Sequence, residues 1–402
     1  MTTSTKQVVD SAQVLVPDGL LSRPMGSALG VAAIGLGVSA IIGIGQPAQL
    51  WRAYLVAYLF LLSLALGGLF FVLLHFATSA GWSVVVRRIA EHVMGTLPVL
   101  ALLFLPLIFG LRALYPWSNP DIVAGDALLQ HKQLYLNTGF FYLRAAFYLV
   151  TWSVLAWWFR AWSLRQDDSG EEAITLKLQR ASAPALVVFG LTVTFAAFDW
   201  IMSLDPHWSS TIFGVYFFAG CVVAGLALLL ILILWLQGRG LLTDMITLEH
   251  HHDLGKLLFA FVCFWAYIGF SQFLLIWYAN EPEETEWYAR RLHGGWSNLT
   301  IALAIGHFVL PFLFLLPRTL KRKRPLLLAA PYWLLVMHYL DLYWLVVPSL
   351  TRTRPGLHPL DLTVLGGLGG LFVAVLSFLM RQPGLVPLRD PRLEESLRFK
   401  NQ

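Results

Sequence analysis

The stretch TIFGVYFFAGCVVAGLALLLILILWL, residues 211–236, contains no charged residue. A helix needs about 20 apolar residues to cross the roughly 30 Å hydrocarbon core of a bilayer, because its backbone polar groups must be paired within the segment. This stretch is long enough, and similar stretches recur along the 402-residue chain. The sequence therefore predicts ten membrane-spanning helices, at approximately 28–45, 53–77, 93–111, 138–160, 183–203, 211–236, 257–279, 299–317, 326–349 and 360–380.

The composition supports the same fold class, an all-α polytopic membrane protein. Hydrophobic residues make up 57% of the chain and charged residues only 13%, whereas a soluble protein needs about a quarter of its residues charged. The outer surface must therefore face lipid. The formal net charge of +5 does not indicate nucleic-acid binding, because the basic residues gather in short loops between the apolar stretches. Cys221 and Cys263 lack the spacing of a covalent haem, an iron–sulfur cluster or a disulfide framework.

Loop charges predict the orientation of the chain. Lys and Arg are about three times as frequent on the side of the two termini as on the opposite side, which places both termini in the cytoplasm. We expect an N-terminal tail at 1–27, a transmembrane domain at 28–380 and a basic C-terminal tail at 381–402. The cytoplasmic loop at 243–256, which contains His250 to His252, is expected to be solvated or to face a partner, because adjacent histidines on a helix point in different directions.

Several polar side chains fall in the external half of the predicted membrane. Counting about 1.5 Å per residue from the midpoint of each span places His307 and His338 near the centre. By the same rise, the others lie roughly 4 to 9 Å outward: Asp341, Ser271, Gln272, Arg144 and Asp199. Because a titratable group in hydrocarbon needs a partner or a function, this distribution predicts a polar pocket that opens outward. The alternative is a set of hydrogen bonds that only hold the helices together.

His307 and His338 also raise the possibility of a bis-histidine haem, but nothing else in the sequence supports one. Small residues recur every four positions in the first span, as Gly35, Ser39 and Gly43, and in the last span. Such faces let helix backbones touch. For these terminal spans we slightly favour docking onto a partner subunit over packing within the chain.

Two long strings resemble the F subunit of bacterial alternative complex III. They are DLGKLLFAFVCFWAYIGFSQFLLIWYANEPEETEW (253–287) and FDWIMSLDPHWSSTIFGVYFFAG (198–220). The F subunit is similar to the membrane subunit of polysulfide reductase, in the NrfD-like family. The resemblance implies two four-helix bundles, at approximately 53–203 and 211–349, with one flanking span on each side.

The resemblance also implies a function. Alternative complex III is a quinol oxidoreductase of the bacterial cytoplasmic membrane that passes electrons to a periplasmic cytochrome c or copper protein. The implied partners are an iron–sulfur protein, a multihaem cytochrome c, a related NrfD-like membrane subunit and lipids, with haem and iron–sulfur clusters only in the partners. Menaquinone or ubiquinone is the implied ligand. The matching strings add Asp205 and His207 to the candidate site residues.

We therefore expect a quinone pocket, a proton pathway or both in the periplasmic half of the membrane. His338 and Asp341 are the expected proton acceptors, Asp199 and His307 the expected relays, and Arg144 the orienting group. A stand-alone proton channel or secondary transporter is one alternative, and it predicts inverted repeats with broken helices. A purely structural membrane anchor is another.

Overall fold

The computed structural model describes residues 11–17, 19–351, 355–382 and 384–400, and no strand occurs among them. Ten helical spans are long and apolar enough to cross a membrane, which confirms the fold class expected from the sequence. Each predicted stretch lies largely within one of these spans. The spans are α2 (Ser22–Gly45), α3 (Pro47–Ala77), α4 to α6 (Val84–Met94, Leu97–Leu103, Leu105–Phe109), α10 (Thr138–Ser169), α11 with η3 (Glu172–Trp200, Met202–Leu204), α12 (Phe213–Gln237), α13 (Leu248–Ala279), α15 with η4 and α16 (Trp296–Leu303, Ala304–Val309, Leu310–Leu315), α18 (Arg324–Leu350) and α19 (Pro359–Arg381).

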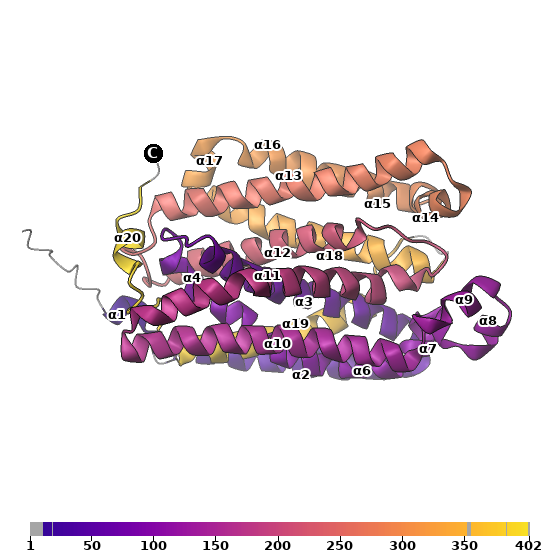
Figure 1. Cartoon of the computed structure of the whole chain (residues 1–402), viewed down its shortest axis with the longest axis horizontal. Coiled ribbons are helices and arrows are strands. Elements are labelled where there is room, and N and C mark those ends of the chain that lie inside the picture. The colour runs from indigo at the N-terminus through magenta and orange to yellow at the C-terminus, as the bar shows by residue number, and fades with distance from the viewer. Residues whose placement is uncertain (1–10, 18, 352–354, 383, 401–402) are drawn as a thin grey trace, which may run out of the picture.

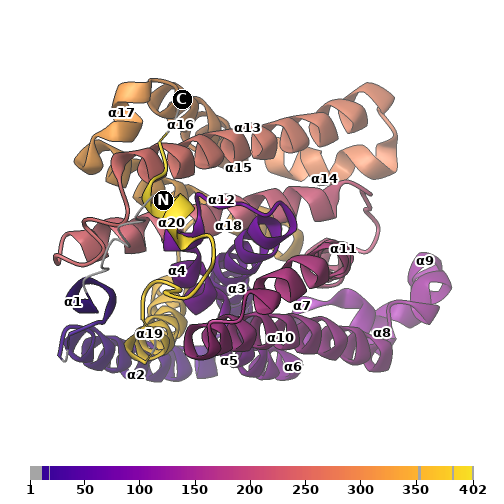
Figure 2. The ribbon, with the colours of Figure 1, turned by 60° about the vertical axis from the view of Figure 1, so that its left-hand side comes forward.

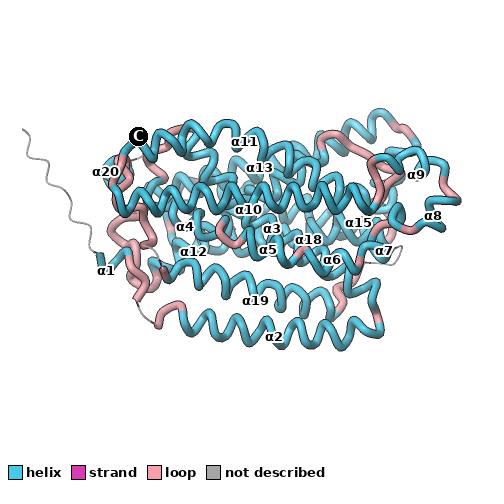
Figure 3. Tube along the Cα trace, turned by 60° about the horizontal axis from the view of Figure 1, so that its bottom comes forward, coloured by secondary structure: helices cyan, strands magenta, loops and turns pink. Residues whose placement is uncertain are grey.

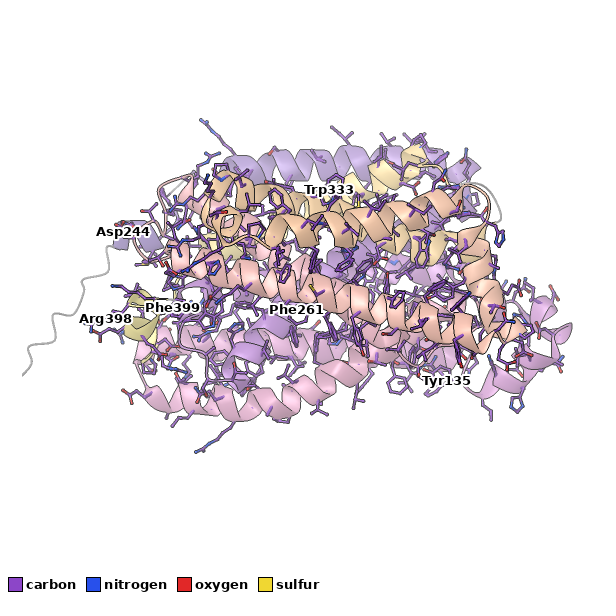
Figure 4. The ribbon with its side chains drawn as sticks, turned by 90° about the horizontal axis from the view of Figure 1, so that it is seen from above. Tyr135, Asp244, Phe261, Trp333, Arg398 and Phe399 are labelled. Atoms are coloured by element: carbon purple, nitrogen blue, oxygen red, sulfur yellow. The ribbon has the colours of Figure 1, made fainter. Side chains whose placement is uncertain are left out.

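Short helices mark the two ends of the bundle (Figure 1). One end, here called the terminal face, carries α1 (Ser11–Val14), α17 (Arg318–Arg322) and α20 (Leu393–Leu397). The other end, here called the loop face, carries α7 (Leu111–Leu114), η1 (Pro116–Ser118), α8 (Pro120–Ala124), α9 (Ala127–His131), η2 (Lys132–Leu134) and α14 (Pro282–Leu292). In Figure 4, Tyr135 lies at the loop face, whereas Asp244, Arg398 and Phe399 lie at the terminal face.

The spans from α3 to α18 pack around two central helices, α3 and α12 (Figure 2). α3, α4 to α6, α10 and α11 form the first bundle, and α12, α13, α15 to α16 and α18 form the second. α3 and α12 contact each other. In the most apolar 18-residue stretch of each helix, 89% of the residues of α3 and 83% of those of α12 are buried, more than in any other span. These two helices are therefore the core of the molecule. Their glycines allow it: a Cβ at Gly67 would lie 2.2 Å from the carbonyl oxygen of Cys221.

The small residues of the first and last spans serve packing within the chain, which corrects the preference for partner docking. α2 and α19 lie side by side along their length (Figure 3). A Cβ added at Gly35 would lie 2.7 Å from the backbone nitrogen of Gly367. Ser39 Oγ also donates a hydrogen bond to Thr363 Oγ1 at 2.8 Å. Because the two backbones approach so closely, the small-residue face of α2 is covered by α19.

Charged residues that precede the predicted third span belong to its helix. α4 begins at Val84, and Arg87, Arg88 and Glu91 are all buried. Glu91 forms ion pairs with both arginines, at 3.3 Å from Arg87 Nε, which also donates a hydrogen bond to it, and at 2.8 Å from Arg88 Nε. Arg87 also pairs with Asp390 of the C-terminal tail at 2.6 Å. Mutual pairing is what allows these charges to be buried.

The histidine run is also buried, contrary to the expectation of a solvated or partner-facing loop. α13 begins at Leu248, so His250, His251 and His252 lie in its first turns, with at most 8% of each residue exposed. The C-terminal tail covers this end of the molecule, since Ser396 Oγ donates to the carbonyl of Trp82 at 2.6 Å. Residues 384–400 are therefore part of the folded structure.

Candidate functional site

An open cavity of about 670 Å³ lies in the second bundle, between α13 and the broken span formed by α15, η4 and α16. Its volume is within the 300–1,000 Å³ range of small-molecule sites. Its walls are mainly apolar, and they include residues that are exposed on the outside of the bundle, such as Tyr267 (65%), Phe270 (61%) and Val309 (40%). In a membrane these residues face acyl chains. The cavity therefore opens sideways toward lipid.

Two polar side chains of the cavity wall converge on one buried carboxylate. Tyr216 on α12 and Trp265 on α13 both line the cavity. The hydroxyl of Tyr216 donates to Asp341 Oδ1 at 2.6 Å, and the indole N–H of Trp265 donates to Oδ2 at 3.2 Å. Asp341 is 1% exposed. Gly269 gives Tyr216 this position, because a Cβ there would lie 2.8 Å from the tyrosine ring.

His338 lies one turn before Asp341 on α18 and reaches the central helix α3. Its Nε2 lies 2.8 Å from Ser63 Oγ, whose hydroxyl donates to the carbonyl of Phe60 at 2.6 Å. Because the Ser63 proton is used in this way, we assign the proton of His338 to Nε2. Its Nδ1 is then an acceptor, with no hydrogen-bond partner among the described residues. A Cβ at Gly220 would lie 2.8 Å from the imidazole, so only glycine leaves room for the ring there.

His307 lies in η4, a π-helical segment. Wide π turns are rare and occur often at functional sites. The imidazole is fully buried and lies 3.9 Å from the Trp265 ring, centroid to centroid. Neither ring nitrogen has a hydrogen-bond partner among the described residues. Trp333 donates to the carbonyl of Gly306 at 2.6 Å, which satisfies one backbone group of the distorted turn.

α14 lies at the loop-face end of the cavity, where Tyr288 and Leu292 line it. Gln272 lines the cavity, accepts from Ser210 and donates to the hydroxyl of Tyr288, both at 3.0 Å. Burial raises the pKa of Tyr288 to about 12, so its hydroxyl stays protonated at neutral pH. Arg291 fastens α14 to the end of α18 by donating to the carbonyls of Trp344 (3.2 Å) and Leu345 (2.8 Å). These bonds hold α14 against the second bundle at this end of the cavity.

Arg144 and Asp199 form a separate cluster in the first bundle. Arg144 donates from Nε to Oδ2 at 2.7 Å and from the terminal amine to Oδ1 at 2.9 Å. Tyr148 donates to the same carboxylate at 2.8 Å, and the guanidinium lies 3.9 Å from the Tyr135 ring. None of these residues lines the cavity. Asp199 and Asp341 therefore do not share one pocket as expected, because each carboxylate is satisfied by the helices of its own bundle.

The other candidates lie at the loop face or on the outside of α13. Asp205 pairs with Arg290, and His207 Nε2 lies 2.7 Å from Asp126 Oδ2. Hydrogen bonding, first from the backbone N–H of Leu129, lowers the pKa of Asp126. These contacts join the 204–210 segment to both α9 and α14. Ser271 is half-buried on α13 and does not line the cavity.

The cavity thus presents an apolar space large enough for a ring, a tyrosine hydroxyl that donates a hydrogen bond to a buried carboxylate, and an amide. This arrangement is suited to an apolar ring that carries hydroxyl or carbonyl oxygens, with Tyr216 and Asp341 as a route for a proton. Sequence reasoning missed Tyr216, Trp265 and Tyr288. One signal was available: a buried Tyr or Trp usually has a hydrogen-bond partner. Asp341 is that partner for both Tyr216 and Trp265. No protein-family model matches the sequence, and a search of curated proteins finds no match.

Proposed function

We propose that this chain is an integral membrane subunit of a quinol:electron-acceptor oxidoreductase, and that the cavity of the second bundle binds the quinone ring. The observation that carries the proposal is the hydrogen bonding of two cavity-wall residues, Tyr216 and Trp265, to the buried carboxylate of Asp341. The resemblance to the F subunit of alternative complex III supports the same assignment. On this proposal the acceptor is a periplasmic cytochrome c or copper protein.

The shape of the cavity favours a lipid-soluble ligand over a water-soluble one. It opens on the lipid-facing side of the bundle, and residues of α14 line its loop-face end. A quinol carries an apolar ring and tail with two hydroxyl groups, so it can enter from the bilayer and place one hydroxyl against Tyr216. A transported ion or sugar would instead need a path to water.

Quinol oxidation releases two protons and two electrons. We assign the first proton step to the Tyr216 hydroxyl, which passes a proton to Asp341 when it receives one from the quinol. His338 and His307 lie next to this pair, with imidazole rings 6.3 Å apart, and extend the set of proton-binding groups toward α3. The two electrons would leave through iron–sulfur and haem groups held by partner subunits. The proposal places the terminal face in the cytoplasm and the loop face in the periplasm of a bacterial cytoplasmic membrane.

Filling the cavity tests the ligand assignment. Ala304 lines the cavity, whereas Leu313 on α16 is 58% exposed and does not. The protein, purified from native membranes in mild detergent, is extracted with solvent and its quinone content is measured by chromatography. We expect bound quinone in the wild type and in Leu313→Trp, and little in Ala304→Trp. Wild type without quinone, or equal retention by the two variants, would contradict the assignment.

The subunit assignment is tested by what co-purifies. We expect iron–sulfur and haem-bearing proteins in constant ratio to this chain, seen by mass spectrometry and by a reduced-minus-oxidised visible spectrum. A chain that purifies alone and conducts protons in liposomes would support the stand-alone channel or transporter instead. A chain that purifies with such partners but holds no quinone would support the structural anchor.

A further inference from the structure

A second groove lies on the outside of the first bundle. It shares no lining residue with the quinone cavity, and the inference drawn from it does not depend on the proposed function. Its volume is about 450 Å³, and it is formed by α10 and α11 near the terminal face. Trp158 of α10 forms one side. Ala173, Leu176 and Ala181 of α11 provide apolar surface, and Lys177 and Arg180 provide positive charge.

Two of the cations at this groove make cation–π contacts with the indole ring of Trp162. Lys177 Nζ lies 3.2 Å from the centroid of the Trp162 ring, and the guanidinium carbon of Arg165 lies 4.9 Å from the same ring. Lys177, Arg180 and Arg165 are all exposed, and none of them forms an ion pair within the described part of the chain. Tryptophan and unpaired cations together are suited to the headgroup level of a membrane.

The position of the groove along the helices fits that level. α10 and α11 contain 32 and 29 residues, so at 1.5 Å per residue each is longer than the roughly 30 Å hydrocarbon core and extends beyond it. Lys177 lies about 7.5 Å inside the start of α11 by the same rise. The carboxylates of Asp168, Glu171 and Glu172 lie further out, at the turn between the helices. We therefore place the cations at the level of the lipid phosphates, with the acidic groups beyond them on the water side.

Below the cations, the exposed faces of both helices are apolar. Val154 (51% exposed) and Trp157 (65%) lie just before Trp158 on α10, and Val187 (64%) and Val188 (40%) lie about two turns beyond Ala181 on α11. We infer that this groove is a binding site for an anionic diacyl phospholipid. The phosphate lies between Lys177 and Arg180, and the acyl chains lie along these apolar faces. A basic pocket between spanning helices at the cytoplasmic side is a known type of anionic-lipid site.

The test is native mass spectrometry of the purified complex titrated with phosphatidylglycerol or with phosphatidylcholine of the same acyl chains. We expect one phosphatidylglycerol bound more tightly than phosphatidylcholine. The double variant Lys177→Gln/Arg180→Gln should weaken phosphatidylglycerol binding about 30-fold, from about 1 kcal/mol for each cation, and leave phosphatidylcholine binding unchanged. Ala181→Trp, which fills the groove without changing charge, should also displace the lipid.

The matched control is Arg239→Gln/Arg318→Gln. It removes the same charge from exposed positions near the terminal face, where Arg239 lies 5.3 Å from the Trp235 ring without lining this groove. The inference is overturned if the control weakens binding as much as the test variant, since general surface charge would then be the cause. It is also overturned if wild type shows no preference for phosphatidylglycerol, or if glycerol 3-phosphate displaces the lipid at equal concentration. Quinone content is a separate measurement, so failure here leaves the proposed function unaffected.

Discussion

Replacing Asp341 with asparagine should separate its chemical role from its structural one. Asp341 accepts two hydrogen bonds, from Tyr216 at 2.6 Å and from Trp265 at 3.2 Å. Asparagine has the same shape but offers only one oxygen, so one of these buried donors loses its acceptor. An unsatisfied buried donor costs about 1–3 kcal/mol. We therefore expect Asp341→Asn to fold and assemble with a modest loss of stability.

The effect on turnover should be much larger. Asparagine cannot accept a proton from Tyr216, and removal of a general base typically lowers the rate by about 10²- to 10⁴-fold. Turnover is measured with a short-chain quinol and an electron acceptor in the purified complex, and assembly is followed by gel filtration. Asp341→Leu is the structural comparison, because it leaves both donors unsatisfied and should cost about 2–6 kcal/mol.

Tyr216→Phe completes the experiment, since it removes only the hydroxyl and keeps the ring in the cavity wall. If the tyrosine passes its proton to Asp341, the two groups act as one unit, and the double variant should be no slower than the slower single variant. Turnover of Asp341→Asn within about twofold of wild type would refute the proton route. Two independent effects that multiply would show that the residues do not act together.

The other expected outcomes concern the rest of the fold. Arg144→Met should destabilise the protein by about 3–5 kcal/mol, because it leaves a buried carboxylate without its charged partner; thermal unfolding in detergent measures the loss. Ser39→Cys with Thr363→Cys should form a disulfide within one chain upon mild oxidation, since the native oxygens are 2.8 Å apart; a covalent dimer on a non-reducing gel would contradict the packing. The backbone N–H of Leu129 lowers the pKa of Asp126, so the ionised carboxylate stabilises the start of α9 at any pH above its ordinary pKa of about 4. This stabilisation is lost as the pH falls through the lower pKa of the folded state. Hydrogen exchange of α9, corrected for intrinsic rates, should therefore rise only in that acidic range.

The number and order of the spans could be predicted because a spanning helix is specified by its own residues. Apolar runs such as residues 211–236 must be helical in lipid, whatever their neighbours are. The helix ends were harder to predict. Hydropathy treats Arg87 and Glu91 as unfavourable, yet both are buried. Glu91 and Asp390 compensate the charge of Arg87, and Arg87 and Arg88 compensate that of Glu91. Compensation between distant segments does not appear in a local window.

Only part of the candidate site could be predicted, because only some of its geometry depends on local sequence. Depth along a span follows from counting residues, so the placement of His338 and Asp341 together on one helix could be predicted. Which bundle a side chain faces depends on helix rotation. The π-helical turn at 304–309 adds backbone to one turn and rotates the residues beyond it, and nothing in the letters marks such a turn. Tyr216 and Trp265 were likewise hidden among many aromatic residues, since 14% of the chain is aromatic.

The pairing of the first span with the last has a consequence for how the protein is made. α2 leaves the ribosome early, but Gly367 and Thr363, against which it packs, follow more than 300 residues later. At the usual 5–20 residues per second, α2 waits on the order of half a minute for its neighbour. During that interval its glycine face is open to lipid and to other nascent chains. A chaperone or insertase that shields a single helix would therefore raise the yield of this protein, and a ribosome stall before α19 would leave α2 without its neighbour.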